Sequence, residues 1–507
     1  MNHMLPAEIV LLALLGAPGI LAAWAFGPGR HTPRMTGHLG AAVAAGGLLS
    51  TLLLVFITPG AAVTAGPIGF AVDRLSVILL LLVFGVSSIT QAFAVRYLAG
   101  DSRAAWFTGG AGLLTAASAG LVTASTLIGL ALCWSLAGAA LCLLLAIYRL
   151  PSARDGLRRT AAAFLVGDLA LWVAVVLATV TWGPVTLASA GGQVSGPLVP
   201  VVALLVALAA LSRSAQIPFH RWLPATLAAP TPVSALLHAG VVNAGGILLI
   251  RLAPMTASGV AQLLVGIAGA ATMVYGATIM LIKPDIKGAL VHSTTAQMGF
   301  MILTCGLGLW VATVIHLVAH GFYKATLFLA SGSAIAHGRR ARSIPPPDPA
   351  GSRGTGARAA TAIFLPAAAL ALALVISPGG ALLAEERTAE KALLVFAWVT
   401  GAAVIWGWMQ RRPGPLGALT GSAFLFPIAI AYVATIHAIG DYLKPSLPPA
   451  TLPAAAVWAG IVASLAVLGL SAVVRRAPAT GRLQRALYSR ALSAGHIPTP
   501  TMAGASS

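Results

Sequence analysis

The chain has 507 residues, of which 58% are hydrophobic and 8% are charged, and its mean hydropathy is +0.93. Soluble domains carry roughly 25% charged residues, so this composition excludes an ordinary soluble protein and indicates that lipid is the solvent. The formal charge of +19 resembles the excess of positive charge in nucleic-acid-binding proteins. The placement of the basic residues argues against that class.

Apolar runs long enough to cross a bilayer recur along the chain from Ile9 to Val474. We count about fifteen runs of roughly 20 residues, which predicts an all-α polytopic membrane protein of about 13–15 transmembrane helices. The first run lacks a basic segment before it and a good cleavage site within it. We therefore expect a retained helix rather than a signal peptide.

The Lys and Arg residues are distributed unevenly between the two ends of the predicted helices. Most lie in odd-numbered loops and in the C-terminal tail, whereas the even-numbered loops hold only Arg74, Arg251, Arg387, Lys391 and Lys444. This is the positive-inside pattern, and it predicts that the N-terminus lies outside and the tail lies in the cytoplasm. The basic charge therefore sets membrane orientation, and no nucleic-acid partner is expected.

The chain also contains two polar segments and three cysteines. Residues 339–358 carry a Pro triplet and five arginines, which predicts a cytoplasmic linker between two helical blocks. The tail after Arg475 is basic and is expected to be disordered beyond about Ala491. Cys133, Cys142 and Cys305 lie within apolar runs without the paired spacing of metal or disulfide frameworks, so we predict no metal site in this chain.

Pro and Gly residues interrupt the apolar pattern in two places. The segment from Ser212 to Pro232 contains four prolines, and Ser377-Pro378-Gly379-Gly380 precedes Glu385 and Glu386. Broken helices are tolerated within a membrane where protein or a water-filled cavity satisfies the freed backbone groups. Paired breaks predict inverted repeats with an ion site near each break, and ordinary loop turns are the alternative.

A few ionisable residues lie within the predicted spans. Each costs about 2.5–3.5 kcal/mol to insert, so their presence points to function. The candidates are Asp168, Arg213, His238, His316, His320 and Lys324. A structural ion pair is the alternative interpretation of Asp168 with Arg213, and a satisfied core histidine that of His238.

His316, His320 and Lys324, here called the polar stripe, are spaced four residues apart. This spacing places them on one helical face, about 6 Å apart along the axis, a distance that one water can bridge. Both residue types can accept and release a proton, so the polar stripe predicts cation transport; helix packing is the alternative. Lys287 fits a cytoplasmic anchor, or else reaches inward beside His292.

Three ordered motifs resemble the antiporter-like subunits of respiratory complex I and of Mrp antiporters. They are PFHRWLPATLAAPTPVSALLHAG from Pro218, DIKGALVHSTTAQMGF from Asp285 and HLVAHGFYKATLFLASG from His316. The resemblance covers most of residues 73–332 and implies two inverted five-helix repeats with broken helices, and proton translocation along buried charges. Three ordered motifs are far more specific than one.

The resemblance also implies roles and boundaries. His238, Lys287, His316, His320 and Lys324 match the family's central relay, and Asp168 matches its helix-six aspartate. The expected parts are N-terminal helices over 1–100, a first repeat over 101–255, a second over 256–415, C-terminal helices over 416–475 and a basic cytoplasmic tail over 476–507.

The sequence departs from this family at the first half-channel. Ser135, in CWSLAG, occupies the glutamate position, and Arg213 occupies the lysine position. Arginine stays protonated at any relevant pH, so it cannot pass on a proton as a lysine would. The second break also lacks the family's lysine, so an ordinary complex I relay is incomplete here.

These departures, together with RYLAGD (Arg96 to Asp101) and HAGVVNAGGILLIRLAP, make the chain similar to the DabB family. That resemblance implies a bacterial inner-membrane subunit that carries a proton or sodium ion and has no cofactor of its own. It also implies a DabA-like, carbonic-anhydrase-like zinc partner on the cytoplasmic side, which converts carbon dioxide to bicarbonate. The chain would then be a transport subunit rather than an enzyme.

We therefore expect Asp168 and Arg213 to gate access to His238, followed by the polar stripe. A proton-pumping or sodium/proton antiporter subunit of a complex I or Mrp assembly is the first alternative. A passive membrane anchor with structural charges is the second, and it predicts that uncouplers leave the activity of its complex unchanged.

Overall fold

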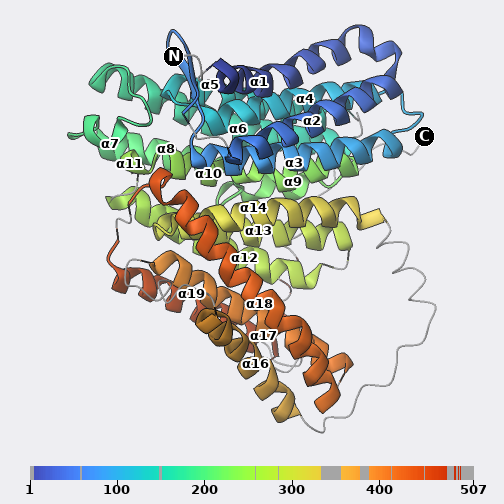
Figure 1. The fold of residues 1–507 in the computed structure, drawn as a ribbon, viewed down its shortest axis with the longest axis vertical. Helices are drawn as coiled ribbons and strands as arrows, with labels where there is room; N and C mark the ends of the chain where they lie inside the picture. Colours follow the sequence, from blue (N-terminus) through green and yellow to red (C-terminus); the bar gives the residue numbers. More distant parts are fainter. Residues whose placement is uncertain are drawn as a thin grey trace.

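The computed structural model shows a helical protein arranged in three groups of helices. It describes residues 5–56, 60–147, 151–256, 259–283, 285–332, 355–376, 387–412, 414–449, 452–476 and the single positions 485, 486, 489 and 492. Figure 1 shows the groups in sequence order, from the blue N-terminal helices through the green and yellow central helices to the orange and red C-terminal ones.

The N-terminal group contains six long helices and one hairpin. The helices are α1 (Leu5–Phe26), α2 (Pro33–Phe56), α3 (Arg74–Tyr97), α4 (Ala104–Thr123), α5 (Leu127–Leu145) and α6 (Pro151–Trp182). Strands β1 (Ala62–Ala65) and β2 (Ile68–Ala71) pair antiparallel between α2 and α3. The hairpin was not predicted, because four-residue strands are too short to show an alternating pattern.

The central group consists of long helices and several short ones. In chain order they are α7 (Ala190–Gln193), α8 (Val199–Arg213), η2 (Phe219–Trp222), η3 (Pro224–Thr226), α9 (Thr231–Ala239), η4 (Val241–Asn243), α10 (Ala244–Arg251), α11 (Ala253–Thr256), α12 (Gly259–Ile282), α13 (Ile286–Gly306) and α14 (Trp310–Leu329). The predicted break from Ser212 to Pro232 is present, since α8 ends at Arg213 and α9 begins at Thr231.

A second interruption lies at Gly240, where α9 ends and one 3-10 turn leads into α10. The sequence pattern does not predict this break, because the stretch contains no proline between Pro232 and Gly240. Asn243 satisfies one backbone group at the break, since its Nδ2 donates a hydrogen bond to the Ala239 carbonyl oxygen at 2.8 Å. The break thus lies in a buried segment, and a side chain of the same segment supplies a hydrogen bond to the freed backbone.

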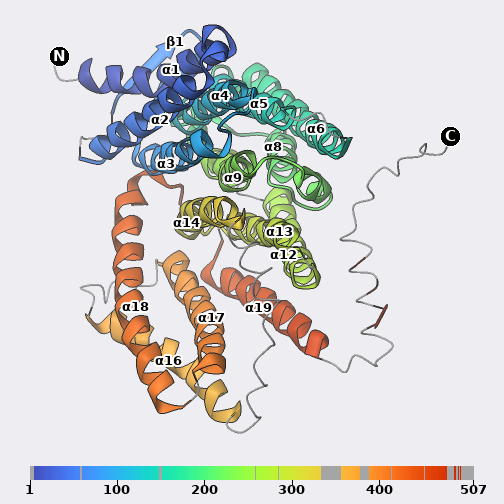
Figure 2. The same cartoon turned by 90° about the vertical axis from the view of Figure 1, so that its right-hand side faces the viewer.

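The C-terminal group consists of α16 (Thr355–Ile376), α17 (Thr388–Arg411), α18 (Pro415–Leu443) and α19 (Ala454–Arg476). In Figure 2, α18 is seen from the side whereas α13 and α14 are seen nearly end-on, so α18 is strongly inclined to them. The last residues of the predicted linker, 355–358, are helical instead, because α16 begins at Thr355. The rest of that linker and the predicted break at Ser377 lie outside the described residues, as does nearly all of the tail after Arg476.

Twelve of the described helices are long and apolar enough to cross a membrane, and Val199–Arg213 and Ala454–Val467 are shorter apolar helices. The prediction of an all-α polytopic membrane protein is therefore confirmed. Helix α8 is shorter because the break follows it. The length of an apolar helix alone is therefore a poor guide to whether this segment spans the membrane.

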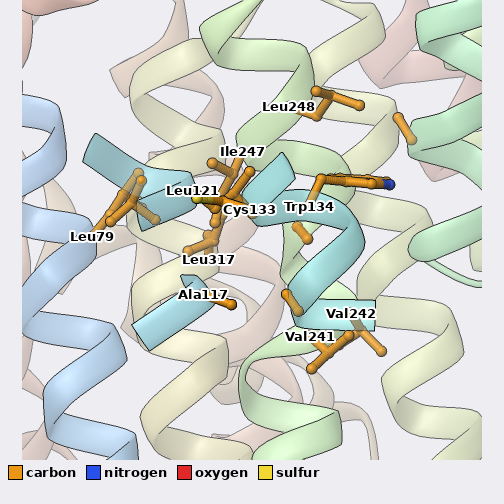
Figure 3. Packing of buried hydrophobic residues seen from close by; sticks show 14 of the residues in the cluster. Leu79, Ala117, Leu121, Cys133, Trp134, Val241, Val242, Ile247, Leu248 and Leu317 are labelled. Atoms are coloured by element: carbon orange, nitrogen blue, oxygen red, sulfur yellow. The ribbon is translucent and has the colours of Figure 1, made fainter. Parts of the chain in front are cut away.

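The main core lies where the N-terminal and central groups meet. Figure 3 shows Leu79 of α3, Leu121 of α4 and Trp134 of α5 packed with side chains of α10 and α14. Trp134 is fully buried. This packing surrounds the Gly240 break and holds α9 and α14 side by side.

Helices α12 and α13 approach each other closely through glycines. A Cβ atom added at Gly269 would lie 2.4 Å from the Leu303 nitrogen, and one added at Gly276 would lie 2.4 Å from the Ala296 nitrogen. Small residues permit such backbone contact, which is a main source of helix association in lipid. This contact fixes the position of α13, which supplies partners to Lys324 of α14.

Gly269→Val should therefore weaken the α12–α13 contact, because the added side chain collides with backbone rather than with a mobile side chain. Overpacking of this kind costs about 1–3 kcal/mol, and we expect a lower thermal unfolding midpoint in detergent. The matched control is Gly46→Val in α2, where nothing lies within 4 Å of an added Cβ. Equal midpoints for the two variants would contradict the proposed contact.

Candidate ion-translocation site

Two members of the polar stripe of α14, His320 and Lys324, are buried against α9, η4 and α13, and His316 is half-buried. The rings of His316 and His320 are nearly parallel, with centroids 5.8 Å apart and an interplanar angle of 10°. His320 is 3% exposed and Lys324 is 0% exposed. The helical spacing thus places the three side chains in one row inside the protein.

His320 contacts the Gly240 break through Asn243. The Nδ1 of His320 lies 3.3 Å from the Oδ1 of Asn243. Because the Nδ2 of Asn243 donates to the Ala239 carbonyl, its Oδ1 faces the histidine as an acceptor. His320 therefore carries its hydrogen on Nδ1 when neutral, and its Nε2, which has no protein partner among the described residues, is the nitrogen that can accept a proton.

His238 lies on α9, two residues before the break, and is 1% exposed. Its ring stacks on Phe328 of α14 with centroids 4.2 Å apart and an interplanar angle of 9°. Its Nδ1 has no hydrogen-bond partner among the described residues. Within the described part of the chain, no carboxylate lies within 4.0 Å of the His238 ring nitrogens.

Lys324 is held by neutral groups of α13. Its Nζ donates to the Ser293 Oγ at 2.7 Å and to the Leu290 carbonyl oxygen at 3.4 Å. Within the described part of the chain, no carboxylate lies within 4.0 Å of it. Buried charges are usually paired, so a lysine without a carboxylate is the kind of site that points to function.

Arg213 and Asp168 form an ion pair between α8 and α6. The Nη2 of Arg213 lies 2.6 Å from the Asp168 Oδ1, and its Nη1 donates to the Trp134 carbonyl oxygen at 3.2 Å. The guanidinium carbon lies 4.3 Å from the Trp134 ring centre and 4.1 Å from the Phe164 ring centre. Arg213 is therefore a fixed charge with several neighbours, in contrast to Lys324.

Gly138 of α5 makes room for this guanidinium. A Cβ atom added there would lie 2.9 Å from the Nη2 of Arg213. Ser135, one turn earlier on α5, accepts a hydrogen bond from Trp172 Nε1 at 3.1 Å. The position that holds a glutamate in the complex I pattern is thus occupied by a neutral hydroxyl that is already bonded.

A small cavity joins the two regions. It has a volume of about 50 Å³ and is lined by Arg213, Leu236, Gly240 and Val241 together with Ser87 and Thr115. A cavity needs roughly 10–15 Å³ of such volume for one water, so this one has room for a few. Arg213 and the Gly240 break therefore border the same cavity, although most of its lining is apolar.

Lys287 is half-buried in the first turn of α13. The ring centre of His292, which follows on the same helix, lies 6.3 Å from that of Tyr275. Of the residues that the structure adds to the site, Asn243 and Ser293 were missed by sequence reasoning. Asn243 follows Gly240 and precedes two further glycines, which is a signal for an interrupted helix.

Comparisons with known proteins show the family of this chain. The family described as NADH:quinone oxidoreductase/Mrp antiporter, TM, matches residues 124–346, and that described as NADH-ubiquinone oxidoreductase (complex I), chain 5 N-terminus, matches residues 63–108. The probable inorganic carbon transporter subunit DabB1 of Halothiobacillus neapolitanus is 34% identical over 398 residues, which cover 74% of this chain and 70% of that protein. The chain belongs to the DabB family. It is a multi-pass, cation-translocating membrane subunit of the antiporter-like type.

The DabB family is related to respiratory and antiporter subunits, and two further similarities show this. NADH-quinone oxidoreductase subunit L of Mycobacterium tuberculosis is 38% identical over 275 residues, which cover 53% of this chain and 43% of that protein. A chain of the Mrp complex from Dietzia sp. DQ12-45-1b superposes with a TM-score of 0.63 at 25% identity, over 97% of this chain and 59% of that one. The antiporter-like fold is thus shared along nearly the whole DabB-type chain.

The ion pair predicts non-additive mutational effects. Asp168→Asn leaves a buried arginine uncompensated, which typically costs about 3–5 kcal/mol, so the thermal unfolding midpoint should fall. The double variant Asp168→Asn with Arg213→Met removes both charges and should recover most of this loss. Midpoints measured in detergent for the two single variants and the double variant test the coupling; a double variant as unstable as the sum of the singles would exclude it.

Proposed function

We propose that this chain carries a proton or sodium ion across the bacterial inner membrane and that this movement drives inorganic carbon accumulation by a bound partner. The observation that carries the proposal is the row from His316 to Lys324, in which His320 and Lys324 are buried. The Nε2 atoms of His316 and His320 have no hydrogen-bond partner among the described residues, and no carboxylate within the described residues immobilises Lys324.

The proposed path runs between His238 and the polar stripe. A proton taken up at Nε2 of His320 moves along the stacked pair to His316, or toward Lys324, whose Nζ is bonded only to a hydroxyl and a carbonyl group. Side chains four residues apart are about 6 Å apart along the helix, so single waters complete the row.

Asp168 and Arg213 are proposed to gate access to His238. Arg213 keeps its charge at any relevant pH, so it acts as a fixed positive charge beside the cavity that extends to Gly240. Movement of Asp168 away from Arg213 would expose that charge and repel a cation at His238. The pair thus controls passage without carrying the ion, which accommodates an arginine at the position of the family's lysine.

The partner is proposed from the family. The relative from Halothiobacillus neapolitanus is named a subunit of an inorganic carbon transporter, which indicates that its transport function is shared with other subunits. We propose that the partner of this chain is a DabA-like, carbonic-anhydrase-like zinc protein on the cytoplasmic side. Cation inflow would drive a one-way conversion of carbon dioxide to bicarbonate there.

A complex I or Mrp type assembly is the second candidate function. It is favoured by the 38% identity with a subunit L and by the superposition on the Mrp complex. The substitutions at Ser135 and Arg213 favour the first candidate, because they remove the glutamate and lysine of the complex I half-channel.

Lys324→Met should abolish cation translocation, because it removes the charge at the end of the row while keeping the side-chain length. In cells that depend on the complex we expect loss of growth at low inorganic carbon, and in proteoliposomes with the purified complex at least a tenfold slower cation uptake. The control is Lys283→Met at the end of α12, outside the row. Normal uptake by Lys324→Met, with the complex intact on gel filtration, would rule out this function for the row.

The partner can be identified by purification of the complex in mild detergent. We expect a large zinc-containing protein in a fixed ratio to this chain, because both subunits are needed for the coupled reaction. Zinc analysis and mass spectrometry of the purified complex test this. Recovery of quinone-reducing or multi-subunit antiporter proteins instead would support the second candidate.

A further inference from the structure

A cleft between α14 and the helix pair α17–α18 contains two cavities that the relay described above does not use. The outer cavity has a volume of about 590 Å³ and lies at the N-terminal ends of α14 and α17 and the C-terminal end of α18. The inner cavity, about 440 Å³, lies further along the same helices. Both are much larger than the cavity beside Arg213.

Four ionisable side chains cluster at the outer cavity. Arg387 Nη2 lies 2.6 Å from Asp441 Oδ1 and its Nη1 lies 3.3 Å from His437 Nδ1. His437 Nε2 lies 3.3 Å from the other Asp441 oxygen. Glu390 is the least strongly held member, since its Oε1 lies 3.8 Å from Arg387 Nη1. Lys444 also lines this cavity, so two carboxylates, two permanent cations and one histidine meet here, and Glu390 is the carboxylate that is held least closely.

Glu390 is the buried member of this cluster. Its side chain is 9% exposed, whereas that of Asp441 is 47% exposed. Gly440 of α18 allows this placement: a Cβ atom added there would lie 3.0 Å from Glu390 Oε1 and 3.8 Å from Val311 of α14. The carboxylate thus reaches the inner end of the outer cavity, next to the helix that carries His316.

The inner cavity has His316 in its wall. The other lining residues are mostly apolar and include Phe300, Leu393, Phe396 and Tyr432. The hydroxyl of Tyr432 donates to the Leu393 carbonyl oxygen at 3.2 Å. His316 Nε2 has no hydrogen-bond partner among the described residues, so the first member of the polar stripe borders a cavity rather than solid packing.

A thin apolar layer separates the two cavities. The outer cavity reaches Glu390 on α17 and the inner one begins at Leu393, one turn or about 5 Å further. The layer between them consists of fully buried side chains of one apolar cluster, Ala312, Ala392, Val433 and Ile436. This apolar layer closes the route from the charged cavity to His316 in this structure.

We propose that the outer cavity is the external port of this chain, at which Glu390 exchanges a monovalent cation, proton or sodium, with the outside solution before the cation passes the apolar layer to His316. The inference rests on the proposed function. Because Arg387 and Lys444 lie in even-numbered loops, the positive-inside pattern places this cavity on the external side.

Thiol accessibility tests the position of the port. In a chain whose three native cysteines are replaced by Ala, Thr388→Cys in the wall of the outer cavity should react with a membrane-impermeant, positively charged methanethiosulfonate reagent added to intact cells. Val433→Cys in the apolar layer is the matched control and should stay unmodified. Reaction of Thr388→Cys only in inverted vesicles, or in neither preparation, would overturn the external port.

Cation uptake by the complete complex tests the role of Glu390. Glu390→Gln should slow uptake at least tenfold, and Glu390→Asp should retain part of it. The control is Asp155→Asn, which breaks a half-buried pair with Arg159 on α6. If Glu390→Gln transports normally while Lys324→Met does not, the port is wrong and the proposed function stands; if Lys324→Met also transports normally, the proposed function itself fails.

Discussion

The helix break at Gly240 determines where the central ionisable groups lie. No water is available in a lipid interior to satisfy freed backbone groups, so the protein must supply the partners. Asn243 does this for the Ala239 carbonyl, and the same amide then presents its oxygen to His320. Gly321 completes the arrangement, because a Cβ atom there would lie only 3.0 Å from the Ala239 oxygen. One backbone requirement therefore brings α14 against α9 and places His238 and His320 together.

Two buried cations in this fold have opposite environments. Arg213 has a carboxylate, a carbonyl and two aromatic faces around it, which together stabilise a permanent charge. Lys324 has a hydroxyl and a carbonyl group, which are good partners for a neutral amine as well as for an ammonium. The environment of Arg213 suits a permanent charge, whereas that of Lys324 suits an amine that gains and loses a proton. This division explains how the chain can lack the glutamate and lysine of the complex I half-channel.

Sequence reasoning was most successful where local periodicity or proline determines structure. The four-residue spacing of the polar stripe and the prolines after Ser212 are local signals, and the structure contains both features. The Gly240 break, by contrast, depends on what packs around a short glycine-rich turn. The cluster around Arg387 and Asp441 joins residues 54 positions apart in sequence, and counting loop charges assigned Arg387 only to membrane orientation. Tertiary packing, rather than local pattern, creates these sites.

The contact between His320 and Asn243 has a consequence for the order of events when the cation is a proton. An amide oxygen accepts a hydrogen bond but does not keep a proton at neutral pH, so the hydrogen on Nδ1 has no onward route in this orientation. A proton that arrives at Nε2 can leave only from Nε2. Net transfer through His320 therefore requires the imidazole or the amide to rotate between arrival and departure. In the proposed relay, each proton that passes His320 would thus be coupled to one side-chain reorientation.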